Sequence, residues 1–483
     1  MPLRNLAWLL VVPALVMVGL AVTSSAPAPD KDYLLVRQVV DVLAEVDANY
    51  YRELSDDDRQ KLVEDMINGG LHQLDPHSEY LNKKKLDEFK TSSEGNYFGV
   101  GIVLGVDEST RQLKVRNPMI GTPAYEGGVL ANDLIMKIEG TPIAPLPEKF
   151  SDAMERADAE RSAIEQARKL IKGDLGTQVT ITFKRAGRIP AEFDISLTRS
   201  RIEMHPVIGV VRRKDDPLKW EWFADPANKI ALIRLKDSFS DLTTKELRAA
   251  LDQINEAGAR GLILDLRDNP GGLLNEAIDV SNLFLTDGQK IVSTRNRHNN
   301  ERSFTAKKEG SLFVPTMDNP RAMAVLVNRN SASASEIVAS ALQDHGRAVI
   351  VGERSFGKGS VQKLLYLNPD KSAAVKLTTE TYWRPSGKNI HRGKLKESEE
   401  WGVRPDDGLE VPIPELDRLR YGFEVERLDY VAGKPAFVGP NPPPPPPAPR
   451  RRQRVLRRKQ TLRGSRAEQG DRDVADQSEG LKQ

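Results

Sequence analysis

The sequence predicts a multidomain α/β protein, and three observations support that prediction. The chain has 483 residues, which is enough for about three domains. From residue 229 onward, apolar strand patterns alternate with helical patterns, an order typical of a largely parallel sheet covered by helices. Before that part, residues 31–90 carry apolar side chains at helical spacing, and residues 97–197 contain short strand patterns.

The N-terminus has the pattern of an export signal. Arg4 precedes an apolar run from Leu6 to Val22, and a basic residue before such a run is expected to stay in the cytoplasm. The run is at the short end for a membrane-spanning helix, and a buried core helix is the alternative. We expect residues 1–29 to be a signal peptide or an inner-membrane anchor. The rest of the chain is then expected in the cell envelope, periplasmic or otherwise extracytoplasmic.

The composition excludes several kinds of site. The chain has no cysteine, so disulfides, thiolate catalysis and cysteine-ligated metals are absent. The six histidines lack the spacing of a zinc site, and we expect no metal and no cofactor. The net charge of +2 on so long a chain predicts no nucleic acid partner.

The first half of the chain is expected to change from helices to short strands. Proline in Asp75-Pro76-His77-Ser78 interrupts the helical pattern, and we favour a structural hydrogen bond over a catalytic role for His77. Glycines between Tyr97 and Leu104 predict a sharp turn or a close backbone approach. A long helix is expected over 148–172, and a hairpin is expected around residues 186–188.

In the second half, four apolar strand patterns define the expected parallel sheet, with helical patterns between them. The carboxyl ends of parallel strands lie at one edge of a sheet, so the loops that follow the last three strands should meet there. The strands are Lys229–Leu235, Leu262–Arg267, Ala322–Val327 and Val349–Val351, and the three loops are Asp268–Gly272, Asn328–Glu336 and Glu353–Lys358.

The middle loop, Asn328–Glu336, carries alternating serines and runs directly into a helical pattern. A hydroxyl at a helix N-terminus suits a nucleophile, because free backbone N–H groups there stabilise an oxyanion. The segment Ser333-x-x-Glu336 is also a capping box, which only starts a helix. Taken alone, the loop favours capping, and its spacing does not choose among Ser331, Ser333 and Ser335.

A lysine in the third loop offers a base for such a nucleophile. Lysine serves as the base in some serine hydrolases, provided that burial or nearby positive charge lowers its pKa from about 10.4. Lys358 follows an apolar strand and is flanked by glycines. Gln362, at i+4, is expected one helical turn away, where its side chain would orient the amine. A surface lysine in a glycine loop is the alternative.

Six motifs follow one another between residues 34 and 410. They are Leu74–Leu81, Phe98–Ile102, Asp265–Gly272, Asn330–Glu336, Gly357–Gln362 and Tyr382–Gly387. With these motifs the chain resembles the carboxy-terminal processing peptidases, or tail-specific proteases, which are serine–lysine endopeptidases with an inserted PDZ domain.

The resemblance implies a domain order. After residues 1–29 we expect a helical region (30–92), a mainly-β PDZ domain (93–203) and a protease core with a crotonase- or Clp-like α/β fold (204–432). Residues 433–483 are expected to form a disordered tail, because consecutive prolines at 442–447 precede a basic, polar segment. We interpret that basic segment as solvated.

The resemblance also implies roles for individual residues. Ser333 matches the nucleophile, Lys358 the general base and Gln362 the residue that positions the lysine. His345, three turns along the helix from Ser333, is expected to be structural. The implied oxyanion donors are backbone N–H groups of Ala334 and of Gly271 or Gly272. The implied carboxylate-binding loop consists of Phe98, Gly99, Val100 and Gly101.

The sequence departs from the family pattern in the expected PDZ domain. Asn132-Asp133 stands where the family usually has Gly-Asp, and the helix over 148–172 is longer than a PDZ domain normally carries. The proline-rich basic tail is also outside the family pattern.

The expected function is that of an exported serine endopeptidase that binds the C-termini of its substrates through the PDZ domain. Expected partners are proteins or peptides with free C-termini, an adaptor protein, the membrane and further copies of the chain. One alternative is a catalytically silent scaffold that binds C-terminal peptides; loss of Ser333 or Lys358 would favour it, and both are present. Acyl-CoA chemistry on a crotonase-type core is a second alternative, which neither the serine–lysine pair nor the PDZ region fits.

Overall fold

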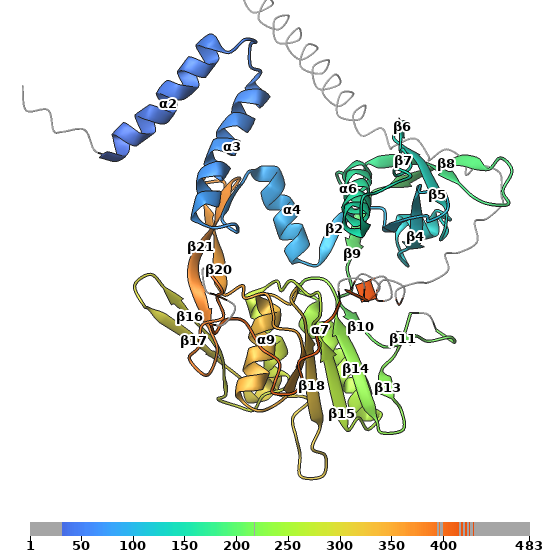
Figure 1. Ribbon diagram of the computed structural model, residues 1–483, viewed down its shortest axis with the longest axis vertical. Helices are drawn as coiled ribbons and strands as arrows, with labels where there is room; N and C mark the ends of the chain where they lie inside the picture. Colours follow the sequence, from blue (N-terminus) through green and yellow to red (C-terminus); the bar gives the residue numbers. More distant parts are fainter. Residues whose placement is uncertain are drawn as a thin grey trace, which may run out of the picture. The chain divides into compact units, whose positions relative to one another are not determined.

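The computed structural model describes residues 31–422, apart from 217, 394–395, 397–398, 415–416 and 419–420, together with 425 and 428. The expected export segment and the expected tail, 433–483, lie outside these residues. The described chain divides into two units (Figure 1). The first unit contains the chain up to Phe98 and from Arg201 onward, and the second runs from Gly99 to Ser200.

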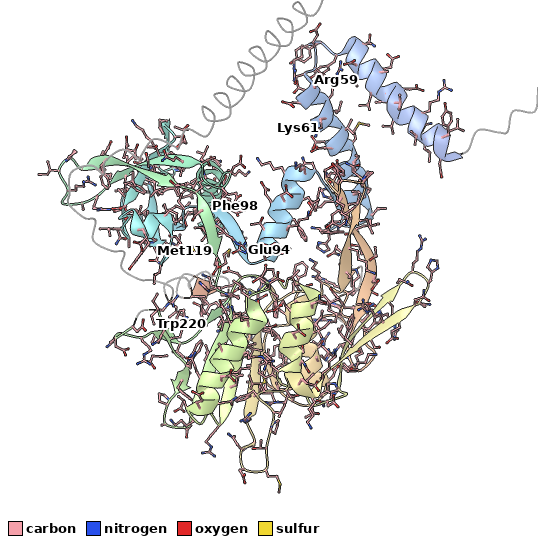
Figure 2. All side chains as sticks on the ribbon, turned by 180° about the vertical axis from the view of Figure 1, so that it is seen from behind. Arg59, Lys61, Glu94, Phe98, Met119 and Trp220 are labelled. Carbon is pink, nitrogen blue, oxygen red and sulfur yellow. The ribbon has the colours of Figure 1, made fainter. Side chains whose placement is uncertain are left out.

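Helices dominate the start of the first unit, as the periodicity predicted. They are α2 (Lys31–Asn49), α3 (Asp56–Leu74) and α4 (Lys83–Ser93), drawn in blue in Figure 1. Arg59 of α3, labelled in Figure 2, forms an ion pair with Asp47 of α2. None of the helices in the described residues is long and apolar enough to span a bilayer, and the apolar run Leu6–Val22 lies outside those residues.

The predicted parallel sheet is present in the first unit. Strands β14 (Ile230–Leu235), β15 (Gly261–Asp265), β18 (Ala322–Val327) and β19 (Val349–Gly352) are neighbours in that order, and every pair is parallel. The short strands β10 (Val207–Ile208) and β13 (Phe223–Asp225) pair antiparallel with β14. The sheet therefore places the ends of β15, β18 and β19 at one edge.

Three helices alternate with these strands and bury their apolar faces in one core. They are α7 (Thr243–Glu256), α8 (Leu274–Asn282) and α9 (Ala334–Asp344), and α8 packs between α7 and α9. Helix α9 is buried along nearly its whole length, from Ala334 to Leu342. The start of α9 is thus held firmly where β18 ends.

A second sheet, which the sequence patterns did not predict, packs against α8 and α9. It is antiparallel and consists of β1 (Glu79–Leu81), β16 (Lys290–Asn296), β17 (Glu301–Thr305), β20 (Ser360–Tyr366) and β21 (Ala374–Trp383). The burial of β20 is confined to its first residues, and β17 is mostly exposed, so their apolar patterns are weak. Because β1 pairs with β21, this sheet also fixes the turn that follows α3.

Several short elements complete the first unit. Strands β2 (Asn96–Gly99) and β9 (Ser200–Glu203) pair where the chain passes from one unit to the other. The remaining elements are β11 (Val211–Arg212), β12 (Trp220–Glu221) and the 3-10 turn η1 (Lys308–Gly310). Figure 2 labels Phe98 of β2 and Trp220 of β12.

The second unit is an antiparallel sheet with one long helix. Its strands lie in the order β3 (Ile102–Val106), β4 (Leu113–Pro118), β5 (Leu134–Ile138), β7 (Gln178–Lys184) and β8 (Glu192–Thr198), and β6 (Thr141–Pro142) pairs with β5. Helix α6 (Ala153–Ile171) buries Ala167 and Ile171 in the core, and α5 (Pro123–Glu126) is a single turn. The predicted long helix and the β7–β8 hairpin are both confirmed.

The Asn132-Asp133 pair has a local physical explanation. Asn132 adopts a φ of 69°, a left-handed conformation that asparagine tolerates better than most residues. The buried Asp133 carboxylate accepts a hydrogen bond from the Leu130 N–H at 2.8 Å and pairs with Arg185 at 2.6 Å. Asparagine therefore maintains the turn that glycine usually forms here.

Candidate active site

Three loops meet at the edge of the parallel sheet, as predicted. The N–H of Ala332, in the loop after β18, donates to the Asn269 carbonyl in the loop after β15, at 3.1 Å. The N–H of Phe356, in the loop after β19, donates to the Ser331 carbonyl at 2.9 Å. The serine loop is thus bonded to the glycine loop on one side and to the lysine loop on the other.

Ser333 differs from the two serines beside it. The Ser331 hydroxyl donates to the Leu266 carbonyl at 2.8 Å, and the Ser335 hydroxyl bonds to Asn269 at 2.9 Å, so both hold loops together. Ser333 directly precedes α9, with φ 52° and ψ −113°. Such a backbone conformation is strained for a residue other than glycine, and strain of this kind is concentrated at functional sites.

The Ser333 side chain is nearly buried and faces a tyrosine. Ser333 is 6% exposed. The phenol of Tyr382, on β21, lies close to the Ser333 side chain, and burial raises the pKa of that phenol to about 12. Tyr382 therefore remains neutral at physiological pH.

The candidate oxyanion donors surround the same residue. A Cβ atom added to Gly271 would lie 2.7 Å from the Ser333 Cβ and 2.8 Å from the Ala334 nitrogen, so only glycine allows this approach. The Gly271 N–H donates to Asn269 Oδ1 at 2.9 Å. In the described chain, the N–H groups of Ala334 and Gly272 donate to no acceptor. Of the two glycines, Gly272 is therefore the one whose N–H is available.

Glu336 joins the serine loop to the lysine loop. Its Oε2 accepts the Ser333 N–H and the Lys358 N–H, each at 2.8 Å. Its Oε1 accepts the Ser355 hydroxyl at 2.5 Å and the Gly357 N–H at 2.7 Å. Burial raises the pKa of this carboxyl to about 7, although these hydrogen bonds favour the ionised form. The capping box is present, and it is one part of a larger network.

Lys358 has the environment that a basic amine needs. Burial lowers the pKa of Lys358, and the positive charge of Lys376 lowers it further. The negative charges of Glu336 and Asp75 oppose this shift. Lys376, on β21, is itself paired with Glu79. Among the described contacts, no hydrogen bond joins Lys358 Nζ to Ser333 Oγ.

The prediction that one helical turn separates Lys358 from Gln362 is wrong. Gln362 lies on the strand β20, because the chain enters the second sheet at Ser360. The Gln362 amide donates to Ser360 Oγ at 2.9 Å and to Thr378 Oγ1 at 3.0 Å. Within the described residues it makes no hydrogen bond to Lys358, so the contact predicted from i+4 spacing is absent.

The Asp75-Pro76-His77-Ser78 turn lies beside the lysine. The Thr378 N–H donates to Ser78 Oγ at 3.0 Å, and Ser78 Oγ donates to Asp75 at 2.6 Å. Burial and the nearby Lys358 charge lower the pKa of His77. The structural hydrogen bond expected of His77 involves its backbone N–H, which donates to Asp75 at 2.8 Å. His77 thus lies closer to the site than the sequence suggested.

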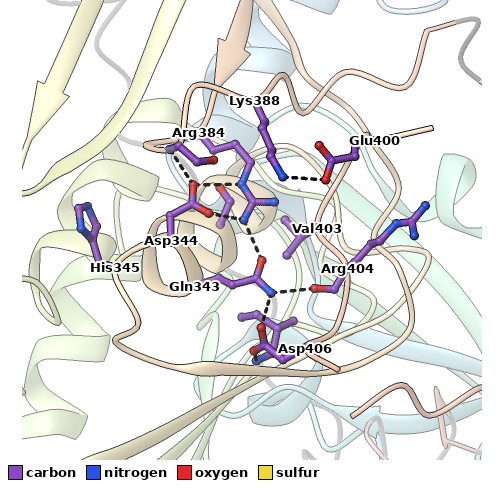
Figure 3. A network of polar contacts seen from close by, with 12 residues as sticks. Gln343, Asp344, His345, Arg384, Lys388, Glu400, Val403, Arg404 and Asp406 are labelled. Carbon is purple, nitrogen blue, oxygen red and sulfur yellow. Dashed lines mark hydrogen bonds and ion pairs between the residues drawn. The ribbon is translucent and has the colours of Figure 1, made fainter. Parts of the chain in front are cut away.

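The far end of α9 is held by a separate polar network (Figure 3). Arg384 donates to the Asp344 carboxylate at 3.1 Å and to Gln343 at 2.8 Å, and Gln343 donates to Asp406 at 2.9 Å. His345 lies to one side of this network and bonds through Nε2 to the Lys290 carbonyl at 2.7 Å. As expected, His345 is structural and lies at the opposite end of α9 from Ser333.

The candidate carboxylate-binding loop is only partly a loop. Phe98 and Gly99 belong to strand β2, which pairs with β9. Beyond them, the carbonyls of Val100 and Gly101 accept the N–H groups of Ala124 and Met119, each at 2.8 Å. The N–H groups of Val100 and Gly101 have no acceptor in the described chain. Gly101, at φ 78°, leaves no room for a Cβ atom beside Thr122.

Comparison with known proteins identifies the family. The model of peptidase family S41 matches residues 229–407. The carboxy-terminal-processing protease of Bartonella bacilliformis is 38% identical over 362 residues, which cover 74% of this chain and 72% of that protein. The chain belongs to the carboxy-terminal processing proteases of peptidase family S41. This protease is therefore a serine peptidase, as the motifs predicted.

Other relatives are similar to this protease over most of their length. The carboxyl-terminal-processing protease of Synechocystis sp. is 34% identical over 363 residues, which cover 74% of each chain. Among solved structures, the photosystem II D1 C-terminal processing protease is 26% identical, with 77% of this chain and 86% of that chain covered and a TM-score of 0.41. The matched family region contains Ser333, Glu336 and Lys358, whereas the Asp75 turn precedes it.

Several residues around Ser333 and Lys358 were not identified as candidates from the sequence of this protease. Asp75 and Tyr382 lie within two of the six motifs, so a closer reading of those motifs would have pointed to them. Lys376 carries no sequence signal, because only strand pairing brings it to the site. Among the described residues, no group of three or more His, Asp or Glu side chains is arranged to hold a metal ion.

Proposed function

We propose that Ser333 is the nucleophile and Lys358 the general base of this protease. The observation that carries the proposal is the strained Ser333 backbone at the start of α9, bonded through Glu336 to the backbone of Lys358. Lys358 is the partly buried amine whose pKa is lowered, as a neutral base requires. Loss of peptide cleavage by purified Ser333→Ala protein tests the assignment. Unchanged cleavage would exclude Ser333 as the nucleophile, whereas a wild-type protein without cleavage would favour the scaffold alternative.

The proposed reaction is acyl transfer in two steps. Ser333 Oγ attacks the scissile carbonyl carbon, and its proton moves to Lys358 Nζ. The N–H groups of Ala334 and Gly272 stabilise the oxyanion, because they have no acceptor among the residues that the structure describes. The C–N bond then breaks, the leaving amine takes the proton from Lys358, and water hydrolyses the acyl-enzyme with Lys358 again as base.

Gln362 is proposed to act on the lysine indirectly. It bonds to Thr378, and Thr378 bonds through Ser78 to the Asp75 carboxylate, whose charge acts on Lys358. In this proposal Gln362 fixes the charged surroundings of the amine and makes no direct contact with it.

We further propose that the unit Gly99–Ser200 is a PDZ domain that binds substrate C-termini. Strand β3 is an edge strand, so a peptide strand can add to it. The N–H groups of Val100 and Gly101, which donate to no acceptor within the described part of the chain, directly precede β3 and suit a terminal carboxylate. Apolar side chains of β3 and α6 pack on the same core, which provides an apolar setting for the terminal side chain.

This recognition predicts a difference between matched peptides with acid and amide C-termini. Charge-assisted hydrogen bonds contribute about 1.5–3 kcal/mol, so amidation should weaken binding by roughly ten- to a hundredfold. Titration calorimetry with the non-cleaving Ser333→Ala protein measures binding free of turnover. Equal dissociation constants for the two peptides would show that the terminal carboxylate is not recognised.

Export, membrane association and self-association are also part of the proposal. Arg4 and the following apolar run support export. Helix α2 exposes a series of large apolar side chains, all at least 45% exposed: Tyr33, Leu34, Leu35, Val36, Val39, Val40 and Val42. Such a surface supports contact with a further copy of the chain or with an adaptor. Light scattering would measure the mass of the resulting assembly.

Export predicts the behaviour of reporter fusions. A reporter enzyme that is active only outside the cytoplasm should be active when fused after residue 432, because Arg4 remains on the cytoplasmic side. The matched control lacks residues 1–29 and should be inactive. Activity of a cytoplasmic reporter at the same junction would contradict export.

A further inference from the structure

We propose that Glu336 is a positioning residue that fixes the nucleophile loop and the base loop at one separation. The proposal rests on the assignment of Ser333 and Lys358 above and adds a third residue to it. A single carboxylate oxygen, Oε2, accepts the backbone N–H of both residues, each at 2.8 Å. The two loops are therefore aligned through one atom.

The other carboxylate oxygen holds the lysine loop from the opposite side. Oε1 accepts the Ser355 hydroxyl and the Gly357 N–H. Ser355 also bonds to the N–H of Val403 at 2.7 Å, which connects the network to a further segment of the core. One side chain on α9 thus fixes three positions in the six-residue loop Glu353–Lys358.

A role limited to capping does not account for this arrangement. In a capping box, the Glu336 side chain would accept only the Ser333 N–H. Three of the four donors to Glu336 come instead from the lysine loop. Glu336 is fully buried, and a Cβ atom added to Gly402 would lie 3.3 Å from Oε1 and 2.8 Å from Ser355 Oγ. Gly402 thus allows the chain to close over the carboxylate.

The chemistry of the side chain explains why a carboxylate is needed. Two carboxylate oxygens can accept all four donors, whereas a glutamine amide would direct N–H groups at two of them. The carboxylate charge also acts on the base, because it opposes the lowering of the Lys358 pKa. The other charged groups that act on Lys358 are Asp75 and Lys376, and His77 lies beside them.

The test is steady-state kinetics of Glu336→Gln on a free-acid peptide. Misplacement of a catalytic group by about 1 Å costs roughly a hundredfold, so kcat should fall about a hundredfold while KM stays within about threefold. Glu336→Asp keeps the charge, but its side chain is one methylene shorter. Its kcat should lie between those of the wild type and Glu336→Gln. The matched control is Asp344→Asn, which breaks the network at the other end of α9 and should keep kcat within about threefold of wild type.

The pH profile separates positioning from general loss of stability. Without the Glu336 charge, the acidic limb of kcat/KM should move to lower pH, because the Lys358 pKa falls further. Asp344→Asn should leave that limb in place, even if its thermal unfolding temperature drops as much as that of Glu336→Gln. The proposal is overturned if Glu336→Gln or Glu336→Asp has wild-type kcat, or if Asp344→Asn loses as much activity as Glu336→Gln. An inactive wild type would instead refute the proposed function.

Discussion

Replacement of Ser333 by alanine should lower kcat by roughly 10⁴- to 10⁶-fold, the range found when a residue of a serine hydrolase site is removed. Ser331 and Ser335 cannot substitute, because their hydroxyls are bonded to the loop after β15. The fold should be unaffected, since the Ser333 backbone N–H that bonds to Glu336 remains. Cleavage of a fluorogenic peptide and thermal unfolding measure the two effects, and Ser331→Ala is the control for the loop.

Lys358→Ala should be as inactive as Ser333→Ala, and the double variant should be no worse, because the two residues act as one unit. Lys358→Arg is the sharper variant. It keeps a positive charge, but a guanidinium does not deprotonate, so it should be equally inactive if Lys358 is the base. Measurable turnover by Lys358→Arg would show that the site needs the charge and not a proton acceptor.

The second large effect is expected on stability, from Asp265→Asn. Asp265 ends β15 and is fully buried. Its carboxylate accepts hydrogen bonds from Arg234 at 2.9 Å, from Arg267 at 2.7 Å and from Tyr421 at 2.9 Å. Loss of the carboxylate charge leaves the buried Arg234 guanidinium without its counter-ion. Breaking a buried pair in this way costs about 3–5 kcal/mol of unfolding free energy.

Chemical denaturation of wild type, Asp265→Asn and Asp215→Asn measures this cost. Asp215 pairs with Arg213 at the surface, where solvent screens the pair, so its loss should shift the unfolding midpoint far less than Asp265→Asn does. Burial raises the Asp265 pKa, but Arg267 and Arg234 outweigh burial and hold that pKa below its ordinary value. A lowered pKa stabilises the fold above the unfolded pKa of about 3.9, and this contribution is lost as pH falls further. Equal midpoints for the two variants at neutral pH would contradict the prediction.

The sequence alone determined the parallel sheet, the helices between its strands and the edge where the three loops meet. Each of these features depends on local periodicity, and the strands from Ile230 to Gly352 are apolar enough to be recognised. The order of the motifs also identified the family, the serine peptidase activity and the pair Ser333 and Lys358 as candidates. The motifs narrowed the choice among the three serines, which spacing had left open.

Tertiary structure decided what surrounds that pair. The second sheet was not predicted, because strands such as β17 lack a continuous apolar face, and that sheet carries Gln362, Lys376 and Tyr382. Gln362 was expected one helical turn from Lys358. The i+4 spacing brings two side chains together only within a helix, and Gln362 lies on the strand β20. Glu336 looked like a cap because its local partner, Ser333, is three residues away, whereas its other donors are 19–22 residues away. Local patterns determine elements, but contacts between distant loops depend on how those elements pack.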